Sequence, residues 1–558
     1  MTRNDDRLYT ARAGLSPIQN DAVDAFVSGQ IDRRQFVRGA TVLGIGVPLM
    51  SALLSACGVG SQTGSGGGGQ KVKGGTLRVA IPKPSGPIDP VTTANQGNIL
   101  LTYPSGEFLL RARPNLTLAP VLAESWKSDK DASVWTFKLK PNVTFQDGHP
   151  MTSADVVATF DRLSDPAGGS TALSAFKGSL TKGGTTAIDT HTVRFELEAA
   201  NGNFPYLVSS DNYSAVILPA SYGGDYEKAG FPGTGKMKLK RYDSRGAAFV
   251  ANAKYWDRSA MPSLDGIEYT YFSDEQPMLL ALQGNQVDVV NQFSVQNGRA
   301  VLSNPSYHVI SNRSAATRVL HLRNDMGPWK DKRVRQALAL SLDRSAIVKG
   351  LLQGRAEIGN DSPFAPVFPS TGDSVPQRKQ DLEKAKQLLA AAGVGRGFKA
   401  PLTVLNQQEI PDYAVLLQSA AKNVGIDLAI TLQDAGTYYG SSKFGSSPWL
   451  DSTAGITDYG HRSVPNVPLT AQLKTGGVWN SAHMSNPQLD GLITSYVSAV
   501  SLSEQKTIAN KLETLLLDET PLVYAYFYNI LGVSTNKITG IVSNAQSQLF
   551  LNDAAFTK

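Results

Sequence analysis

Cysteine is almost absent from this chain, because Cys57 is the single one among 558 residues. A lone cysteine excludes an intrachain disulfide and a thiolate zinc site. Histidine is also rare: the six histidines are scattered, and the sequence contains neither a His-Glu-x-x-His pattern nor a Gly-x-Ser-x-Gly elbow. We therefore predict no catalytic residue, no metal site and no cofactor.

The chain also lacks a concentration of charge of one sign. Lys and Arg number 53 against 47 Asp and Glu, which gives a net charge of +6 without any Lys/Arg block. Nucleic-acid binding requires a clustered basic surface, so we predict no nucleic-acid partner. With 41% hydrophobic and 18% charged residues, 52 glycines and 30 prolines, the composition favours a loop-rich α/β protein of two or three domains over a coiled coil or a disordered chain.

Long apolar runs are missing except near the N-terminus. Gly39 to Ala56 is a stretch of eighteen residues without a charge, preceded by Arg33-Arg34 and followed by Cys57 directly after Leu54-Ser55-Ala56. This arrangement resembles a twin-arginine signal that runs into a bacterial lipobox. We predict that residues 1–56 are a signal peptide and that Cys57 carries a lipid. Two alternatives stay open: the general secretion route, and an uncleaved anchor, since eighteen residues is the lower limit for a membrane span.

Residues 57–74 (CGVGSQTGSGGGGQKVKG) contain almost no side chain that could join a core. A segment of this composition behaves as a flexible coil, so it is predicted to be a tether. Signal and tether together predict an exported protein that is lipid-anchored at the outer face of the bacterial cytoplasmic membrane. The later apolar stretch Pro521 to Thr535 has fifteen residues and is predicted to form buried strands.

The rest of the chain alternates between strand and helix patterns. Residues 75–81 and 134–140 alternate as strands do, and Thr152 with Asp155 forms a capping-box pattern before a helix. A strand at residues 318–324 leads to a helix predicted over 332–347, and residues 401–432 form a βαβ pattern. We therefore expect α/β lobes with mixed β-sheets.

Several segments in fixed order carry a family resemblance. The longest is Val143 to Val157 (VTFQDGHPMTSADVV), and others include Asn252 to Trp256 (NAKYW) and Asp331 to Leu338 (DKRVRQAL). Together they resemble the solute-binding proteins of peptide and nickel ABC importers, over about residues 74 to 535.

The resemblance implies a two-lobed clamp of the periplasmic-binding-protein type, class II, with an extra subdomain in the first lobe. It is implied to act as a monomer that captures a small solute, most simply an oligopeptide, and delivers it to an ABC permease in the membrane. Lobe one is then expected at residues 75–320 plus 525–558, with a subdomain at about 106–232, and lobe two at 321–524. The hinge is expected near Leu320 to Arg323 and Leu522 to Tyr524.

The resemblance also implies a ligand site. In peptide binders of the family, the aspartate of a Trp-x-x-Asp-Tyr motif pairs with the amino terminus of the peptide, and here Gly455 to Tyr459 (GITDY) aligns with that motif. Asp458 and Tyr459 match, but Gly455 replaces the tryptophan. Trp449 is a candidate to supply the missing aromatic wall, and Trp479 and Asn480 are further candidate ligand residues.

Other hypotheses remain at this point. The same fold could bind a sugar or a metal chelate, and His461 and His483 lie in the expected ligand segment. A secreted hydrolase and a surface chaperone or scaffold are alternatives from other classes. A phosphate-binding loop at residues 230–236 (GFPGTGK) is rejected, because Met237 stands where a Ser or Thr should follow and the next residues alternate as a strand.

The lipid prediction can be tested with Cys57→Ala. This variant has no thiol to modify, so it is expected to leave the membrane fraction or to stay unprocessed, since stable anchoring of a lipoprotein requires its acyl chains. Membrane fractionation and intact mass measure both outcomes. Unchanged attachment with residues 39–56 still present would instead establish the uncleaved anchor.

Overall fold

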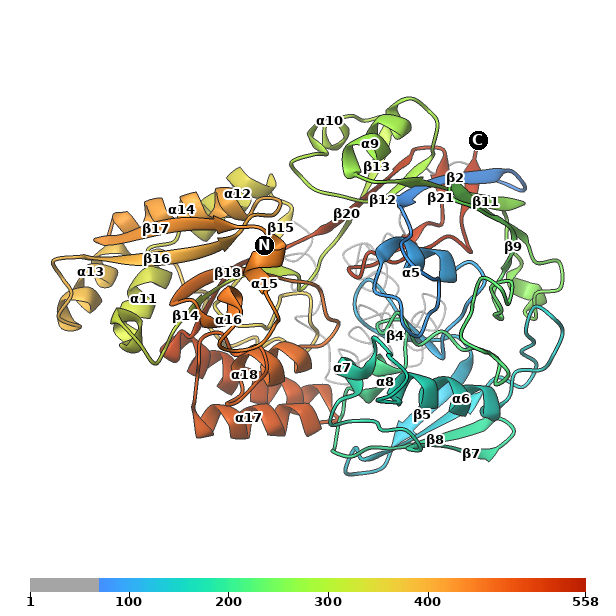
Figure 1. Ribbon diagram of the computed structural model, residues 1–558, viewed down its shortest axis with the longest axis horizontal. Coiled ribbons are helices and arrows are strands. Elements are labelled where there is room, and N and C mark those ends of the chain that lie inside the picture. Colours follow the sequence, from blue (N-terminus) through green and yellow to red (C-terminus); the bar gives the residue numbers. More distant parts are fainter. Residues whose placement is uncertain (1–69) are drawn as a thin grey trace, which may run out of the picture. The chain divides into compact units, whose positions relative to one another are not determined.

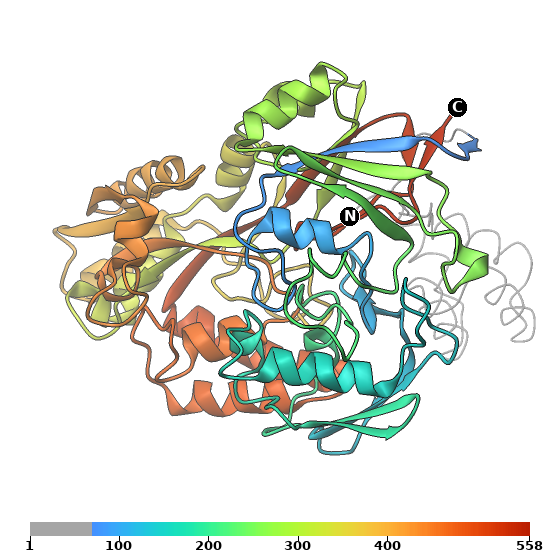
Figure 2. The same ribbon diagram turned by 45° about the vertical axis from the view of Figure 1, so that its right-hand side comes forward.

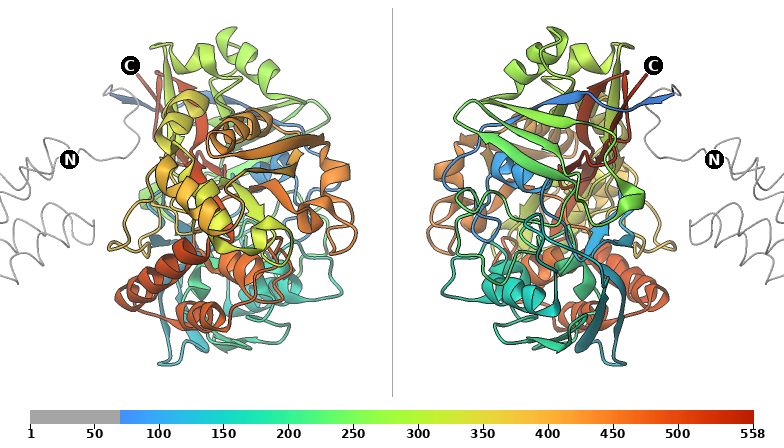
Figure 3. Two further views of the ribbon diagram at one scale, coloured as in Figure 1. Left: turned by 90° about the vertical axis from the view of Figure 1, so that its left-hand side faces the viewer. Right: turned by 90° about the vertical axis from the view of Figure 1, so that its right-hand side faces the viewer.

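The structure, a computed structural model, describes residues 70–558. The predicted signal peptide with Arg33 and Arg34, the predicted lipid site at Cys57 and most of the predicted tether lie outside the described residues. The end of the tether segment forms strand β1 (Lys71–Val72), which pairs with the C-terminal strand β24 (Ala555–Thr557), itself paired with β21 (Ile538–Thr539) (Figure 3). No helix within residues 70–558 has the length and the apolar character needed to cross a bilayer.

One large sheet has seven strands in the order β13-β20-β12-β2-β11-β10-β9 (Figure 1). Its strand β2 is parallel to β11 and β12, whereas the other pairs are antiparallel, which confirms the expected mixed sheet. Leu77, Val79 and Ile81 of β2 belong to one core and Ala80 to another, because successive side chains of a strand point to opposite faces. The strands are β2 (Thr76–Pro82), β9 (Met237–Tyr242), β10 (Gly246–Ala251), β11 (Gly266–Phe272), β12 (Val289–Phe293), β13 (Tyr307–Asn312) and β20 (Ile530–Thr535).

A subdomain built on a four-stranded antiparallel sheet is inserted after β2. The order is β5-β6-β8-β7, and helix α6 lies along this sheet (Figure 2). The predicted capping box is present, since the backbone N–H of Thr152 donates to Asp155 at 2.8 Å, and Phe160 of α6 packs edge-on against Phe195 of β8. The elements are β3 (Leu110–Ala112), β4 (Leu118–Pro120), β5 (Ala123–Ser128), β6 (Val134–Leu139), α6 (Ser153–Ser164), α7 (Leu173–Phe176), β7 (Thr185–Asp189), β8 (Thr192–Glu196) and α8 (Phe204–Leu207).

The second large sheet has six strands in the order β15-β19-β14-β18-β16-β17. The predicted βαβ unit is confirmed, because β16 and β17 pair in parallel and α14 connects them. The elements are β14 (Thr317–Leu322), α11 (Lys332–Leu340), α12 (Arg344–Leu352), β15 (Ala356–Ile358), α13 (Leu382–Ala391), β16 (Phe398–Leu405), α14 (Ile410–Lys422), β17 (Ile426–Gln433), α15 (Ala435–Tyr439), α16 (Pro448–Asp451), β18 (Ala454–Tyr459), η3 (Pro468–Leu473), α17 (Pro487–Ser498), α18 (Leu502–Glu519) and β19 (Leu522–Tyr528).

Shorter elements complete the described part of the chain. They are α5 (Gln96–Thr102), η1 (Arg258–Ala260), α9 (Glu275–Gln283), α10 (Arg299–Leu302), η2 (Pro328–Lys330), β22 (Val542–Ser543) and β23 (Leu549–Phe550). The single helix predicted over 332–347 is wrong, because the chain breaks between α11 and α12. Asp343 causes the restart: its side chain accepts from the backbone N–H of Ala346 at 2.9 Å and caps α12.

The chain crosses between the two large sheets twice, at residues 313–316 and at Asn529. We call the parts built on the seven-stranded and six-stranded sheets lobe one (71–312 and 530–558) and lobe two (317–528). The hinge expected at Leu320 to Arg323 and at Leu522 to Tyr524 therefore lies within lobe two. Its residues belong to β14 and β19, except Arg323, which directly follows β14. Both strands are buried almost throughout, so their sequence pattern does not show where the chain changes sheet.

Side chains of the two lobes bond to each other away from the crossings. Asn203 of the subdomain donates to Asn466 at 2.9 Å, and the Ser463 hydroxyl donates to the half-buried Asp211 carboxylate. The backbone N–H of Gly202 donates to Val497 at 3.0 Å, and a Cβ at Gly202 would lie only 2.0 Å from a carbonyl oxygen of lobe two. A glycine is thus required where the subdomain meets the end of α17.

His461 is hydrogen-bonded to the first crossing between the lobes, residues 313–316. Its Nδ1 accepts from the backbone N–H of Ala315 at 2.9 Å, so this nitrogen must be unprotonated. Burial lowers the pKa of His461 to about 3, and the neighbouring Arg462 acts in the same direction. His461 thus fixes the linker between the lobes as a neutral acceptor.

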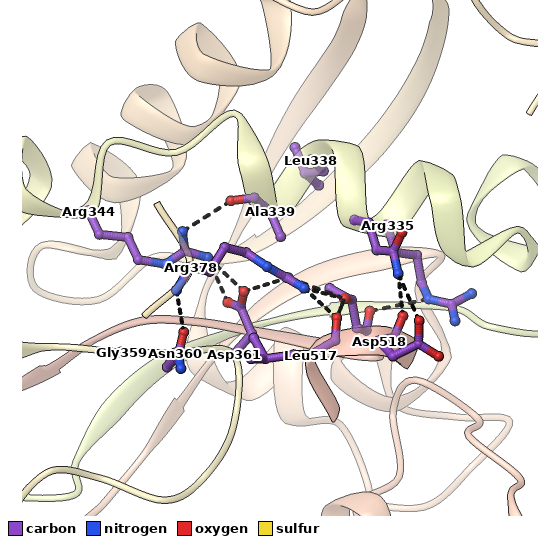
Figure 4. Close-up of polar contacts among 12 residues, drawn as sticks. Arg335, Leu338, Ala339, Arg344, Gly359, Asn360, Asp361, Arg378, Leu517 and Asp518 are labelled. Carbon is purple, nitrogen blue, oxygen red and sulfur yellow. Dashed lines mark hydrogen bonds and ion pairs between the residues drawn. The ribbon is translucent and has the colours of Figure 1, made fainter. Parts of the chain in front are cut away.

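Two arginines, the buried Arg335 and the half-buried Arg378, hold the C-terminal end of α18, directly before β19, and the buried Arg344 lies beside them (Figure 4). Arg335 donates to the carbonyl oxygen of Glu519 at 2.6 Å, and Arg378 donates to that of Leu517. Arg344 and Arg378 both bind the carboxylate of Asp361, which is completely buried, at 2.8 and 2.7 Å. The last carbonyl groups of a helix have no partner within it, so these arginines satisfy them and fix the start of β19.

Asp361→Asn is expected to lower the free energy of unfolding by about 3–5 kcal/mol, because it removes the completely buried carboxylate that pairs the guanidinium groups of Arg344 and Arg378. Urea denaturation followed by circular dichroism measures the change. The matched control is Glu383→Gln in the solvent-exposed pair with Lys386, which is expected to leave the transition unchanged. Equal transitions for the two variants would contradict the structural role of Asp361.

His461→Asn tests the pH dependence of the crossing. The folded-state pKa of about 3 lies below the ordinary value of 6.5, so the unfolded chain binds a proton first and stability is lost as the pH falls from 6.5 towards 3. Asparagine keeps an acceptor for Ala315 without titrating, so the variant is expected to lose less stability than the wild type over this range. Thermal unfolding across that pH series is the measurement, with the exposed His149→Asn as control; equal slopes for His461→Asn and the wild type would contradict the assignment.

Candidate functional site

A cavity of about 320 Å³ opens in lobe two at the end of β18. Thr457, Asp458 and Tyr459 of β18 form one part of its wall, and the following loop up to Arg462 and the start of η3 form another. Ala315 of the first crossing also lines it. The cavity therefore lies beside the point where the chain passes from one lobe to the other.

Aromatic rings cover much of the wall. Tyr439 and Trp449 pack edge-on with centroids 5.8 Å apart, Trp449 lies 6.4 Å from Tyr459, and Tyr459 lies 6.1 Å from Trp479. Tyr524 and Phe527 of β19 add two further rings. Such a surface favours apolar groups and attracts cations to the ring faces.

An ionic cluster lies behind the aromatic wall. Arg318 of β14 is 1% exposed; its Nε donates to Glu409 at 2.8 Å, and its Nη1 donates to Asp458, directly opposite it on β18. The ring of Tyr528 lies 4.2 Å from the guanidinium carbon, and the Tyr528 hydroxyl donates to Asp458 at 3.1 Å. Burial lowers the pKa of Arg318, but Tyr528, Asp458 and Glu409 outweigh it and raise that pKa well above its ordinary value.

The cluster carries one guanidinium against two carboxylates. Glu409 is buried, whereas the side chain of Asp458 is 22% exposed and lines the cavity. The surplus negative charge is therefore presented to the cavity by Asp458. A ligand with a positive group finds its counter-ion there, and an anionic group at the same point would be repelled.

The space beside Gly455, the position of the tryptophan in the family motif, is already filled by other side chains. A Cβ at this position would lie 2.6 Å from Cε1 of His321 and 2.9 Å from the Ser452 hydroxyl. The buried imidazole of His321 thus takes the room beside β18, and a large side chain cannot enter. Trp449, from α16, stands in the cavity wall instead.

Four of the five predicted ligand residues lie together in the cavity wall: Asp458, Tyr459, Trp449 and Trp479. Asn480 does not. Its side chain donates to the carbonyl oxygen of Met484 at 2.7 Å and accepts from the Met484 N–H at 2.9 Å, so it holds a turn outside the cavity wall, and its role as a ligand residue stays a prediction.

Arg318 and Glu409 were not among the residues predicted from the sequence. A charged residue inside the otherwise uncharged strand TRVLHL was a usable signal for Arg318, whereas nothing local marks Glu409 as its partner 91 residues away.

The two histidines of the segment take other positions. His461 binds the linker, and His483 lies 3.6 Å from Asp325 and packs edge-on against Phe444. Within the part of the chain that the structure describes, no group of three or more His, Cys, Asp or Glu side chains is arranged to hold a metal ion.

Comparison with known sequences gives a consistent picture. Residues 117–459, more than half of the chain, match the family model described as "Bacterial extracellular solute-binding proteins, family 5 Middle". The chain is 26% identical over 470 residues to the periplasmic murein peptide-binding protein MppA of Escherichia coli, a match that covers 79% of this chain and 85% of MppA. It is 24% identical over 457 residues to the dipeptide-binding protein DppE of Bacillus subtilis, covering 76% of this chain and 81% of DppE.

Solved structures share the fold. The unliganded open form of MppA superposes with a TM-score of 0.76 at 22% identity and covers 88% of this chain and 99% of that one. A nickel ABC transporter protein from Bacillus halodurans superposes with a TM-score of 0.71 at 23% identity, over 87% of this chain and 100% of that one. With the family model matched along more than half of its length, this chain belongs to the bacterial extracellular solute-binding proteins of family 5.

Proposed function

We propose that this protein is the lipid-anchored binding component of an ABC importer and that its solute is a peptide with a free amino terminus. The observation that carries the proposal is the surplus negative charge of the cluster of Arg318, Glu409 and Asp458 at the wall of an aromatic cavity. The ammonium group of a peptide would make the cluster neutral. The relatives named for murein peptide and dipeptide binding support the same solute class.

Binding would not involve catalysis. In this proposal the two crossings, at residues 313–316 and at Asn529, allow the lobes to rotate while keeping them connected. Closure over the solute would exclude water from the charged cluster, and the permease would recognise the closed form. The anchor at Cys57, the signal at Arg33 and Arg34 and the tether belong to the same proposal and would keep the protein near its permease.

Peptide backbones would supply most of the affinity in this arrangement. One end group is held by Asp458, while the aromatic wall offers contact area that tolerates different side chains. Such a site would bind peptides of mixed sequence, with water filling the space that smaller side chains leave.

The proposal is tested by calorimetry with trialanine and its N-acetylated form. Acetylation removes the positive charge, so it is expected to weaken binding to the wild type by about thirtyfold or more, from the typical 2–5 kcal/mol for breaking a buried charged pair. Asp458→Asn should bind free trialanine about as weakly as the wild type binds the acetylated form, with little further loss on acetylation.

The control is Asp427→Asn, an exposed acid on β17 outside the cavity, which should bind as the wild type does. Equal binding of free and acetylated trialanine to the wild type would show that Asp458 is not the anchor. Binding of a sugar or a nickel chelate in place of any peptide would show that the proposed solute class is wrong.

A further inference from the structure

The turn between β3 and β4 contains one deeply buried side chain, that of Leu116. The three residues before it in the turn, 113–115, are exposed, whereas Leu116 is only 2% exposed. Its backbone has a φ of 60°, in the left-handed region that a leucine rarely adopts. A glycine would form the same turn with less strain, so the leucine side chain is the feature that needs an explanation.

Hydrogen bonds to the backbone of the turn hold its shape. The N–H of Leu116 donates to the carbonyl oxygen of Arg113 at 2.8 Å, and the N–H of Arg113 donates to that of Thr117 at 2.8 Å. The Thr117 hydroxyl donates to Oδ1 of Asn115 at 2.8 Å. The Tyr206 hydroxyl donates to the carbonyl oxygen of Leu116 at 2.6 Å. None of these bonds uses the side chain of Leu116, so the turn can form without it.

The side chain of Leu116 packs in lobe two, although the residue belongs to lobe one. Within the described residues, every other buried member of its apolar core lies in lobe two, between residues 319 and 527. This core includes Phe368, Tyr524 and Phe527, which also line the candidate cavity, whereas Leu116 does not line it. Leu116 therefore fills a place in the core behind the cavity wall, and it can do so only while the two lobes are in contact.

A second contact from lobe one reaches the same part of lobe two. Tyr496, in the last turn of α17, belongs to the core around Leu116, and the carbonyl oxygen of Val497 accepts from the N–H of Gly202 at 3.0 Å. Water replaces such a hydrogen bond when the lobes separate, so its net contribution is small. Exposing the Leu116 side chain to water has no such compensation, and its burial is the larger contribution.

We infer that Leu116 holds the lobes together and thereby sets the affinity for the solute without touching it. This inference rests on the proposed function, because it takes the solute to be bound between lobes that close. An interaction that exists only in the closed form strengthens binding, since closure and binding are linked equilibria. Leu116 is thus a positioning residue, and loss of its side chain would weaken binding of different solutes by the same factor.

Leu116→Gly and Leu116→Met separate the side chain from the backbone. Glycine suits the φ of 60° and should leave the fold intact, which circular dichroism checks. It removes the apolar contact, so calorimetry is expected to show about tenfold or more weaker binding of trialanine, as the burial of one leucine side chain implies. The preference for free over acetylated trialanine should not change. Methionine is apolar and similar in volume, so Leu116→Met should keep most of the affinity.

Hydrogen exchange gives a readout that needs no solute. The N–H of Gly202 donates to Val497 across the lobes, so it is protected only while they are in contact. In solute-free protein this N–H should exchange faster in Leu116→Gly than in the wild type or in Leu116→Met. The matched control is Asn285→Gly, because Asn285 has a similar φ of 55° and is exposed. It should behave as the wild type does in both measurements.

Wild-type affinity and unchanged exchange in Leu116→Gly would overturn this inference and leave the proposed function intact. Equal losses in Leu116→Met and Leu116→Gly would also overturn it, because the apolar contact would then not be the cause. If Leu116→Gly loses the preference for free trialanine, the residue acts on the charged cluster and not on closure. If the wild type does not distinguish free from acetylated trialanine while exchange at Gly202 responds as expected, the proposed function fails and the role of Leu116 between the lobes stands.

Discussion

One buried guanidinium, that of Arg318, connects the elements around the crossing between the lobes. Its strand, β14, begins immediately after the linker at 313–316, and its partner Asp458 lies opposite it on β18. Glu409 reaches it from the residue before α14, and Tyr528 covers it from the last position of β19, next to Asn529. Both crossings and the cavity wall are thus connected through a single cation. A change in the cluster of Arg318, Glu409 and Asp458 therefore acts directly on the region about which the lobes are proposed to move.

The charge balance explains why such a cluster suits a binding site. A cation that is shared by the buried Glu409 and the partly exposed Asp458 leaves one negative charge without compensation, and an uncompensated charge becomes costly when the site closes and water is excluded. A ligand ammonium makes two charges of each sign and removes this cost. The gain depends on excluding water, so it is largest in the closed form. The proposed affinity for a cation and the proposed closure of the lobes are therefore two aspects of one electrostatic arrangement.

Much of the fold could be predicted from local patterns, and the errors have physical causes. Strand alternation and the capping box at Thr152 depend on neighbouring residues and were found. The crossing points were misplaced because β14 and β19 are buried along almost their whole length, so their sequences do not mark where the chain leaves one sheet for the other. The helix over 332–347 was drawn through Asp343, although that residue is a good helix cap.

The candidate site could be predicted where the family motif covers it. It could not be predicted where it depends on pairing between side chains that are far apart in the sequence. Asp458 and Tyr459 follow from the motif, and Trp449 and Trp479 share the cavity with them. The pairing of Arg318 with Glu409 arises from the path of the chain in three dimensions and has no short-range signature. The motif alone also gives no reason for Gly455, whereas His321 beside it does.

Native mass spectrometry of gently purified protein shows directly what the cavity retains from the cell. We expect a bound mass that fragments into amino-acid residues and corresponds to a peptide with an unmodified amino terminus, and we expect it to be lost when the protein is unfolded. A retained sugar or metal chelate, or a peptide whose amino terminus is blocked, would contradict the proposed role of the Arg318, Glu409 and Asp458 cluster.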